Sequence, residues 1–343
     1  MVEIPTSQAT VTVKVIDTTL RMACDSDAFI EPSIGGANNA LHMKTMCFLV
    51  HNHEQNKSIL FDCGSRKDPW QGSPYTRKML RNHVRSFDVE KGVDEVLQDT
   101  GFDLTELDAI IWSHWHWDHI GDSTRFPKST KLVVGPGFID HFTPGWPKNP
   151  EGVLLGSDIE DRDLVEPTYP LEIGGFKAHD YFGDRSFYLL DVPGHAVGHI
   201  CGLARTTPTT FVFLGGDCCH FAGTLRPAVG YPVPCCPDSA SKMRAQGMES
   251  PGYCISTSSR SAYCDPDTAQ KSIENLMAFD TNPNIFTCLA HDNILLDILP
   301  LFNTAPERNI NDWKEQEYKK RAYWGFLREI PEFTSADISV SSR

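Results

Sequence analysis

The segment His114–His119 has the sequence HWHWDH and directly follows an apolar run. It therefore concentrates three imidazoles and one carboxylate at the end of an expected strand. Nitrogen and oxygen ligands of this kind suit zinc and neighbouring first-row ions. In an extended turn, His114 and His116 point to one side of the chain. Asp118 and His119 can then reach a second ion beside the first, so the segment predicts a metal site for two ions.

Further ligand-type residues follow other expected strands. They are Asp62 in Phe-Asp-Cys-Gly, His195 in Pro-Gly-His, Asp217 in Gly-Gly-Asp and His291 in Leu-Ala-His. Zinc sites that only hold a fold together are usually rich in cysteine and have four protein ligands. The candidates in this chain are instead histidines and aspartates, which favours a catalytic site.

Short apolar stretches between turn residues predict the elements that position these ligands. We expect strands at residues 11–15, 47–50, 59–62, 107–113, 131–134, 187–192, 200–204, 211–214 and 285–289. Helical spacing that begins at Val93 ends at Gly101, and a second helix is expected to begin at the cap Asp265. The pattern predicts an α/β chain of sheets joined by loops and occasional helices, and it excludes a helical bundle.

We expect a single domain over residues 1–343 with a long inserted segment at about 218–265. This segment is rich in Pro, Gly, Ser and Cys and shows little periodicity. Loops of this length are usually functional or disordered, and its place between two metal motifs favours a lid over the site. A helical tail is expected at about 293–343.

Composition narrows the class of protein. Acidic residues outnumber basic ones by 45 to 31 without any block of Lys and Arg, which argues against nucleic acid as a partner. No apolar run has the length of a membrane span, and the beginning of the chain lacks a signal-peptide pattern. Eleven cysteines, an odd number, predict mostly free thiols, and the adjacent pairs Cys218-Cys219 and Cys235-Cys236 lack the C-x-x-C spacing of metal sites. We expect a cytoplasmic protein that acts on a small molecule and binds no membrane, and its oligomeric state stays open.

These motifs, in their order along the chain, resemble the metallo-β-lactamase superfamily over about residues 11–292. The resemblance implies an αββα sandwich, in which two mixed sheets pack face to face with helices outside. It implies two divalent metal ions, zinc foremost. For one ion the implied ligands are His114, His116 and His195. For the other ion they are Asp118, His119 and His291, with Asp217 bridging both ions.

Several further residues receive roles from the same resemblance. Asp62 is expected to orient a ligand imidazole. His199 follows a glycine shortly after His195, and it competes with His195 for the ligand role or serves as a structural histidine. We assign catalysis to Asp118, Asp217 and His220, and contacts with the substrate to Trp115, Trp117 and His220. Packing in the core is the alternative for both tryptophans.

The separation of His195 and Asp217 is similar to that in N-acyl-homoserine lactonases. Three residues after the bridging aspartate, those enzymes carry a tyrosine that contacts the substrate carbonyl, whereas this chain has His220. This departure puts the homoserine-lactone substrate in doubt. An imidazole there can donate a hydrogen bond or protonate the leaving group, or it can support a ligand instead.

The resemblance implies a hydrolase, because two ions activate a shared water near neutral pH. A metal-bridging hydroxide would attack the carbonyl of a cyclic ester or cyclic amide, that is, a lactone or lactam of a small molecule. The chain is also similar to fungal members that open such rings. Alternatives are a γ-lactamase that detoxifies benzoxazolinone-type xenobiotics, or a thioesterase resembling glyoxalase II or polyketide-releasing enzymes. An iron-dependent redox enzyme ranks below these.

Overall fold

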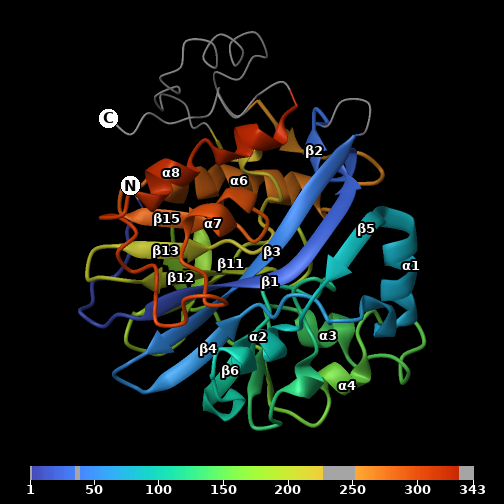
Figure 1. The fold of residues 1–343 in the computed structure, drawn as a ribbon, viewed down its shortest axis with the longest axis horizontal. Helices are drawn as coiled ribbons and strands as arrows, with labels where there is room; N and C mark the ends of the chain where they lie inside the picture. Colours follow the sequence, from blue (N-terminus) through green and yellow to red (C-terminus); the bar gives the residue numbers. More distant parts are fainter. Residues whose placement is uncertain (1, 35–38, 227–251, 332–343) are drawn as a thin grey trace.

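The computed structural model describes residues 2–34, 39–226 and 252–331. Two β-sheets form its centre (Figure 1). The seven strands of the first sheet lie in the order β5 (Val84–Val89), β1 (Thr12–Asp25), β3 (Ala40–Asn52), β4 (Lys57–Phe61), β6 (Leu107–Ile111), β7 (Lys131–Val133) and β8 (Leu164–Val165). The six strands of the second sheet lie in the order β15 (Ile285–Cys288), β13 (Phe211–Leu214), β12 (Ile200–Arg205), β11 (Phe187–Asp191), β10 (Phe176–Asp180) and β9 (Leu171–Ile173). A short separate pair joins β2 (Ile30–Glu31) to β14 (Cys254–Ile255).

The described helices lie in the connections between strands. They are α1 (Pro74–His83), α2 (Val93–Asp99), α3 (Phe138–Phe142), α4 (Gly156–Ile159), α6 (Pro266–Asp280), α7 (Asn293–Ile298) and α8 (Tyr318–Ala322). Shorter 3-10 turns are η1 (Ser26–Ala28), η3 (Pro69–Gln71), η4 (Leu104–Glu106), η5 (Ser123–Arg125), η6 (Ala222–Thr224) and η7 (Gly325–Glu329). Among these helices, none combines the length and the hydropathy that crossing a membrane requires.

Side-chain alternation along the strands creates three apolar layers. In β6, Ala109 and Ile111 join the core that both sheets share, whereas Ile110 faces the core that contains α2. In β12, Ala204 faces the shared core and Leu203 faces the core that contains α6. Both sheets mix parallel and antiparallel pairs. The αββα sandwich expected from the resemblance is therefore confirmed.

Local sequence signals explain where the main helices begin. Ser73 accepts a hydrogen bond from the backbone N–H of Thr76 at the start of α1, and a proline occupies the first helical position. Asp265 caps α6 in the same way, as the sequence predicted. The strands expected at residues 47–50 and 59–62 correspond to β3 and β4, which pair antiparallel. Helix α1, which the sequence analysis did not predict, follows β4 and leads into the edge strand β5.

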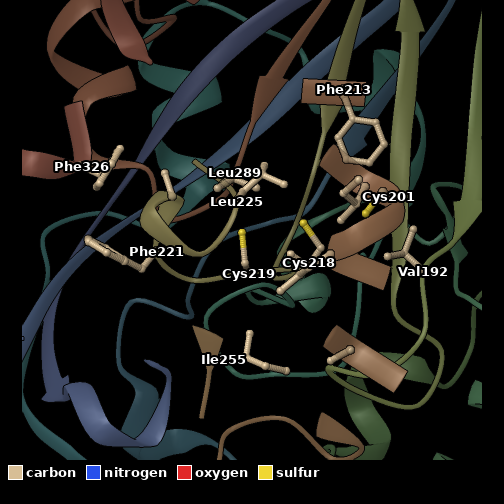
Figure 2. Packing of buried hydrophobic residues seen from close by; sticks show 14 of the residues in the cluster. Val192, Cys201, Phe213, Cys218, Cys219, Phe221, Leu225, Ile255, Leu289 and Phe326 are labelled. Atoms are coloured by element: carbon tan, nitrogen blue, oxygen red, sulfur yellow. The ribbon is translucent and has the colours of Figure 1, made fainter. Parts of the chain in front are cut away.

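The expected insert at 218–265 begins inside the core. Cys218, Cys219 and Leu225 are buried, and they lie near Leu289, which follows β15 (Figure 2). The part of the expected lid at 227–251 lies outside the described residues. The nine described cysteines are free, and Cys235 and Cys236 lie outside the described residues. The tail is a series of short helices, α7, α8 and η7, up to residue 331, and 332–343 lie outside the described residues.

A buried ion-pair cluster connects this segment to the helices near it. The guanidinium of Arg226 is 2% exposed. Its Nη2 lies 3.0 Å from Oδ1 of Asp280 at the end of α6, and its Nη1 lies 3.1 Å from Oδ2 of Asp292 before α7. One cation thus compensates two buried carboxylates.

Replacing Arg226 with methionine should lower the free energy of unfolding by about 3–5 kcal/mol, because two buried carboxylates lose their counter-charge. Urea denaturation followed by circular dichroism measures this change. As a matched control, Arg125→Met removes a guanidinium that is 59% exposed beside Asp94, and it should cost less than about 1 kcal/mol. Equal costs for the two variants would contradict the compensating role of Arg226.

Candidate metal centre

Loops that each follow a strand bring the candidate ligands to one end of the sandwich. The string 114–119 follows β6, and His195 follows β11. Asp217 follows β13 and His291 follows β15. Both sheets therefore contribute, and the shared core between them fixes the distance between their loops.

Three imidazole nitrogens converge in a first group. Nε2 of His195 lies 3.1 Å from Nε2 of His114 and 3.0 Å from Nδ1 of His116. Burial lowers the pKa of His114 and His195 well below the ordinary range, and it lowers the pKa of His116 to about 3. The rings are therefore neutral, and neutral imidazole is the form that binds metal. Lone pairs directed at one another favour a cation between them.

Asp217 lies between this group and a second one. Its Oδ2 is 3.6 Å from Nε2 of both His114 and His195. Its Oδ1 is 3.1 Å from Nε2 of His119 and 3.2 Å from Nε2 of His291. One carboxylate oxygen therefore faces each group of imidazoles.

The second group is richer in negative charge. Oδ2 of Asp118 lies 3.7 Å from Nε2 of His119 and 3.5 Å from Nε2 of His291. Burial disfavours the charged form of both imidazoles, but Asp217 and its neighbours outweigh burial and raise the pKa of both. Carboxylates that stabilise an imidazolium in this way can stabilise a metal cation at the same place.

The donor atoms fit bound metal. Nε2 of His119, Nε2 of His291 and Oδ1 of Asp217 are buried and make no hydrogen bond to any described residue. Such an unsatisfied buried atom costs about 1–3 kcal/mol, and coordination would satisfy all three. Among the described residues, two groups hold their ligand atoms within 4.8 Å of one another: His114, His116, His195 and Asp217, and Asp118, His119, Asp217 and His291. This His/Asp cluster can therefore bind metal ions.

Asp62 supports the second group from behind. Its Oδ1 accepts the backbone N–H of Ser113 at 2.7 Å, and its Oδ2 lies 2.8 Å from Nδ1 of His119. A carboxylate only accepts, so Nδ1 of His119 carries a proton, and in the neutral ring the lone pair of Nε2 faces Asp217. Asp62 has a φ of +63°, a left-handed conformation that is uncommon outside glycine. This conformation follows β4 directly and turns the side chain towards β6.

His199 uses both of its ring nitrogens away from the two groups. Nδ1 donates to the backbone carbonyl of Val192 at 2.9 Å, and Nε2 accepts the backbone N–H of Asp217 at 3.1 Å. The structure therefore brings His195, and not His199, together with His114 and His116. His199 instead holds the backbone of Asp217.

A cavity of 480 Å³ opens beside the cluster. Its wall includes His116, Asp118, His195, Asp217, His220 and His291 from the site, together with the predicted contacts Trp115 and Trp117. Other parts of the wall are apolar side chains from β1, β3 and α1, among them Met22, Met43 and Met79. The contribution of α1 was not predicted from the sequence, although Ser73-Pro74 is a recognisable helix start.

His220 lies at the boundary between the cavity and the cluster. Its Nε2 is 3.0 Å from Oδ2 of Asp217, and its Nδ1 is 3.0 Å from the hydroxyl of Tyr263. Tyr263 was not identified from the sequence, because a lone tyrosine in an aperiodic segment carries no signal of its own. The ring of Phe29 also packs against the imidazole of His220, with ring centroids 4.5 Å apart.

Asp62→Asn should weaken metal binding by about 10–100-fold, because it removes the acceptor that fixes the tautomer of His119. Competition with a chromophoric chelator measures the affinity. Asp108→Asn is the matched control, since Asp108 accepts a backbone hydrogen bond from Ser58 near the start of β6. If both variants bind metal as tightly as the wild type, Asp62 does not orient a ligand.

Comparison with known proteins agrees with this geometry. Residues 43–212 match the family model described as Metallo-beta-lactamase superfamily. The chain is 38% identical to Metallo-hydrolase mfmC of Annulohypoxylon moriforme, over 95% of this chain and 89% of that protein. It is 36% identical to Gamma-lactamase FDB1 of Fusarium pseudograminearum, over 100% of this chain and 87% of that protein. Some relatives are longer, and the chain spans 38% of Cytochrome P450 monooxygenase mpaDE of Penicillium roqueforti.

Solved structures are similar in fold. The crystal structure of B. thuringiensis AiiA with N-decanoyl-L-homoserine bound at its active site superposes with a TM-score of 0.61. The alignment covers 88% of this chain and 99% of that one, at 17% identity. At this identity the likeness concerns the arrangement of sheets and helices alone.

Proposed function

Since the chain belongs to the metallo-β-lactamase superfamily, we propose that it is a dinuclear metal-dependent hydrolase that opens a cyclic ester or cyclic amide of a small molecule. The position of Asp217 carries the proposal, because its two oxygens face two separate groups of imidazoles. The relative named Gamma-lactamase FDB1 supports a cyclic amide. The fold is shared with a solved N-acyl homoserine lactone hydrolase, and this likeness is compatible with a cyclic ester.

The ligand sets follow from the two groups. His114, His116 and His195 would hold one ion, Asp118, His119 and His291 would hold the other, and Asp217 would be shared. Imidazole and carboxylate donors favour zinc. When bound, two such ions polarise a carbonyl oxygen and lower the pKa of water towards about 7.

The residues of the chain bind and orient the substrate. Trp115 and Trp117 offer flat walls to a ring, and Phe29 faces the same cavity. His220 lines the cavity beside Asp217, so it can donate a hydrogen bond to an oxygen of the ring or of the leaving group. Asp118 also lines the cavity, so its carboxylate would lie beside a bound substrate.

The cavity also limits the substrate class. Its volume of 480 Å³ suits a small molecule, and methionine side chains adapt to apolar shapes. The net charge of −14 disfavours strongly anionic ligands and nucleic acid. We therefore propose an uncharged, largely apolar ring compound as substrate, with no nucleic-acid or membrane partner.

Mass spectrometry of the products tests the proposal, because opening either ring adds a water molecule. A lactone becomes a hydroxy acid and a lactam becomes an amino acid, whose amine can take up the proton that the new carboxyl group releases. Metal-loaded protein is offered panels of lactones, lactams and thioesters. Turnover of a lactone or lactam supports the proposal. Turnover of thioesters alone would replace it with a thioesterase, and intact substrates in all three panels would refute it.

Asp217→Ala and His119→Ala should each abolish turnover and lower the number of metal ions bound per chain, while the protein stays folded. The reason is that each change removes one of the candidate metal ligands of the second group. Elemental analysis gives the metal content, and circular dichroism reports the fold. His179→Ala is the matched control, because His179 lies on β10 outside both groups. Full activity in either site variant would contradict the ligand assignment.

A further inference from the structure

Tyr263 forms the outer end of a buried chain of polar groups. Its hydroxyl lies 3.0 Å from Nδ1 of His220, and Nε2 of the same imidazole lies 3.0 Å from Oδ2 of Asp217. The two rings stand almost perpendicular, with centroids 5.3 Å apart. Both side chains are buried, so the chain of contacts does not depend on a surface rotamer.

The backbone around Tyr263 is fixed on both sides. The N–H of Ala262 donates to the carbonyl of Ala28 at 2.8 Å, and the N–H of Cys264 donates to the carbonyl of His195 at 3.0 Å. Asp265 adds a bond from its N–H to the carbonyl of Gly194 at 2.9 Å. The segment that carries the phenol is therefore held against the loop that carries His195.

The donors and acceptors in this chain allow one consistent assignment for a neutral imidazole. A carboxylate oxygen only accepts, so the contact with Asp217 requires the proton of His220 on Nε2. Nδ1 then has a lone pair, and the hydroxyl of Tyr263 is the group that donates to it. With the opposite tautomer, the lone pair of Nε2 would face Oδ2 of Asp217. His119 and His291 face Asp217 in that way, but they belong to a group of candidate ligands around a cation, and His220 belongs to neither group.

We infer that Tyr263 is a positioning residue that holds the proton of His220 on Nε2, the nitrogen beside Asp217 at the cavity wall. This inference rests on the proposed function, in which Asp217 is shared by two ions. His220 then has one N–H, on Nε2, which donates to Asp217 and can be shared with a substrate oxygen that enters beside it, and it is not a metal ligand. Oδ2, the oxygen that His220 contacts, is also the one that faces His114 and His195.

Histidine ¹⁵N resonances of the full chain test the tautomer without any substrate. The spectrum of His220→Phe identifies the signals of His220 in the wild type. We expect the proton on Nε2 of His220, in chelator-treated as well as zinc-loaded protein, and a displaced Nδ1 signal in Tyr263→Phe. A proton on Nδ1 in the wild type, or an Nδ1 signal that Tyr263→Phe leaves unchanged, would overturn the inference.

A double-mutant cycle tests whether Tyr263 acts through His220. Tyr263→Phe should lower kcat by about 10–100-fold while KM changes less than about twofold, as for other partners of site residues. The double variant His220→Phe with Tyr263→Phe should be as active as His220→Phe alone. Fully additive losses would overturn the inference, because the tyrosine would then act independently.

The matched control is Tyr169→Phe. The hydroxyl of Tyr169 is buried and makes no hydrogen bond to any described residue, so its loss should leave kcat and the signals of His220 unchanged. Metal titration of the wild type separates the two proposals. A wild type that binds no metal refutes the proposed function, whereas the tautomer of His220 decides the inference in either case.

Discussion

The structure of the centre depends on one buried carboxylate that faces two sets of imidazole lone pairs. Asp217 is 2% exposed, and its two oxygens approach nitrogens from loops of both sheets. Bringing those nitrogens together without a cation is unfavourable, because lone pairs and unsatisfied acceptors then lie in a low-dielectric interior. The packed core between the sheets compensates for this cost. It fixes the ends of β6, β11, β13 and β15 at separations that the loops alone could not maintain.

Residues around the cluster form hydrogen bonds with the outer ring nitrogen of a histidine, and these bonds determine which atom the inner nitrogen presents to the site. Asp62 accepts from Nδ1 of His119, and the backbone carbonyl of Lys44 lies 2.9 Å from Nδ1 of His291. Each of these acceptors leaves the lone pair on Nε2. His220 follows the opposite pattern, because a donor, Tyr263, faces its Nδ1. The partner of Nδ1 therefore distinguishes His119 and His291, which present a lone pair on Nε2, from His220, for which we infer a proton on Nε2.

Local sequence patterns marked the candidate ligands, whereas their division into two sets, and the choice of His195 over His199, came from the resemblance to the metallo-β-lactamase superfamily. The candidates lie in segments that follow apolar strands, and strand ends can be read from a short window of sequence. The support around the cluster required the fold. The role of His199 depends on the backbone N–H of Asp217, and Tyr263 reaches His220 across a separation of 43 residues. Neither contact leaves a periodic pattern. The apolar wall from α1 was missed because that helix has few buried residues, Leu80 being the one that is fully buried.

The charge of the centre links folding to metal binding. Asp62, Asp118 and Asp217 are all buried in a chain that already carries a net charge of −14. Without metal, protonation of His119 and His291 balances part of this negative charge. Protonation also removes the lone pair that a metal needs. Bound divalent cations would supply the counter-charge and leave the imidazoles neutral. Metal ions would therefore satisfy the buried acceptors and keep the imidazoles in the neutral form that binds metal. Protons can satisfy those acceptors only by converting imidazoles into imidazolium ions, which do not bind metal.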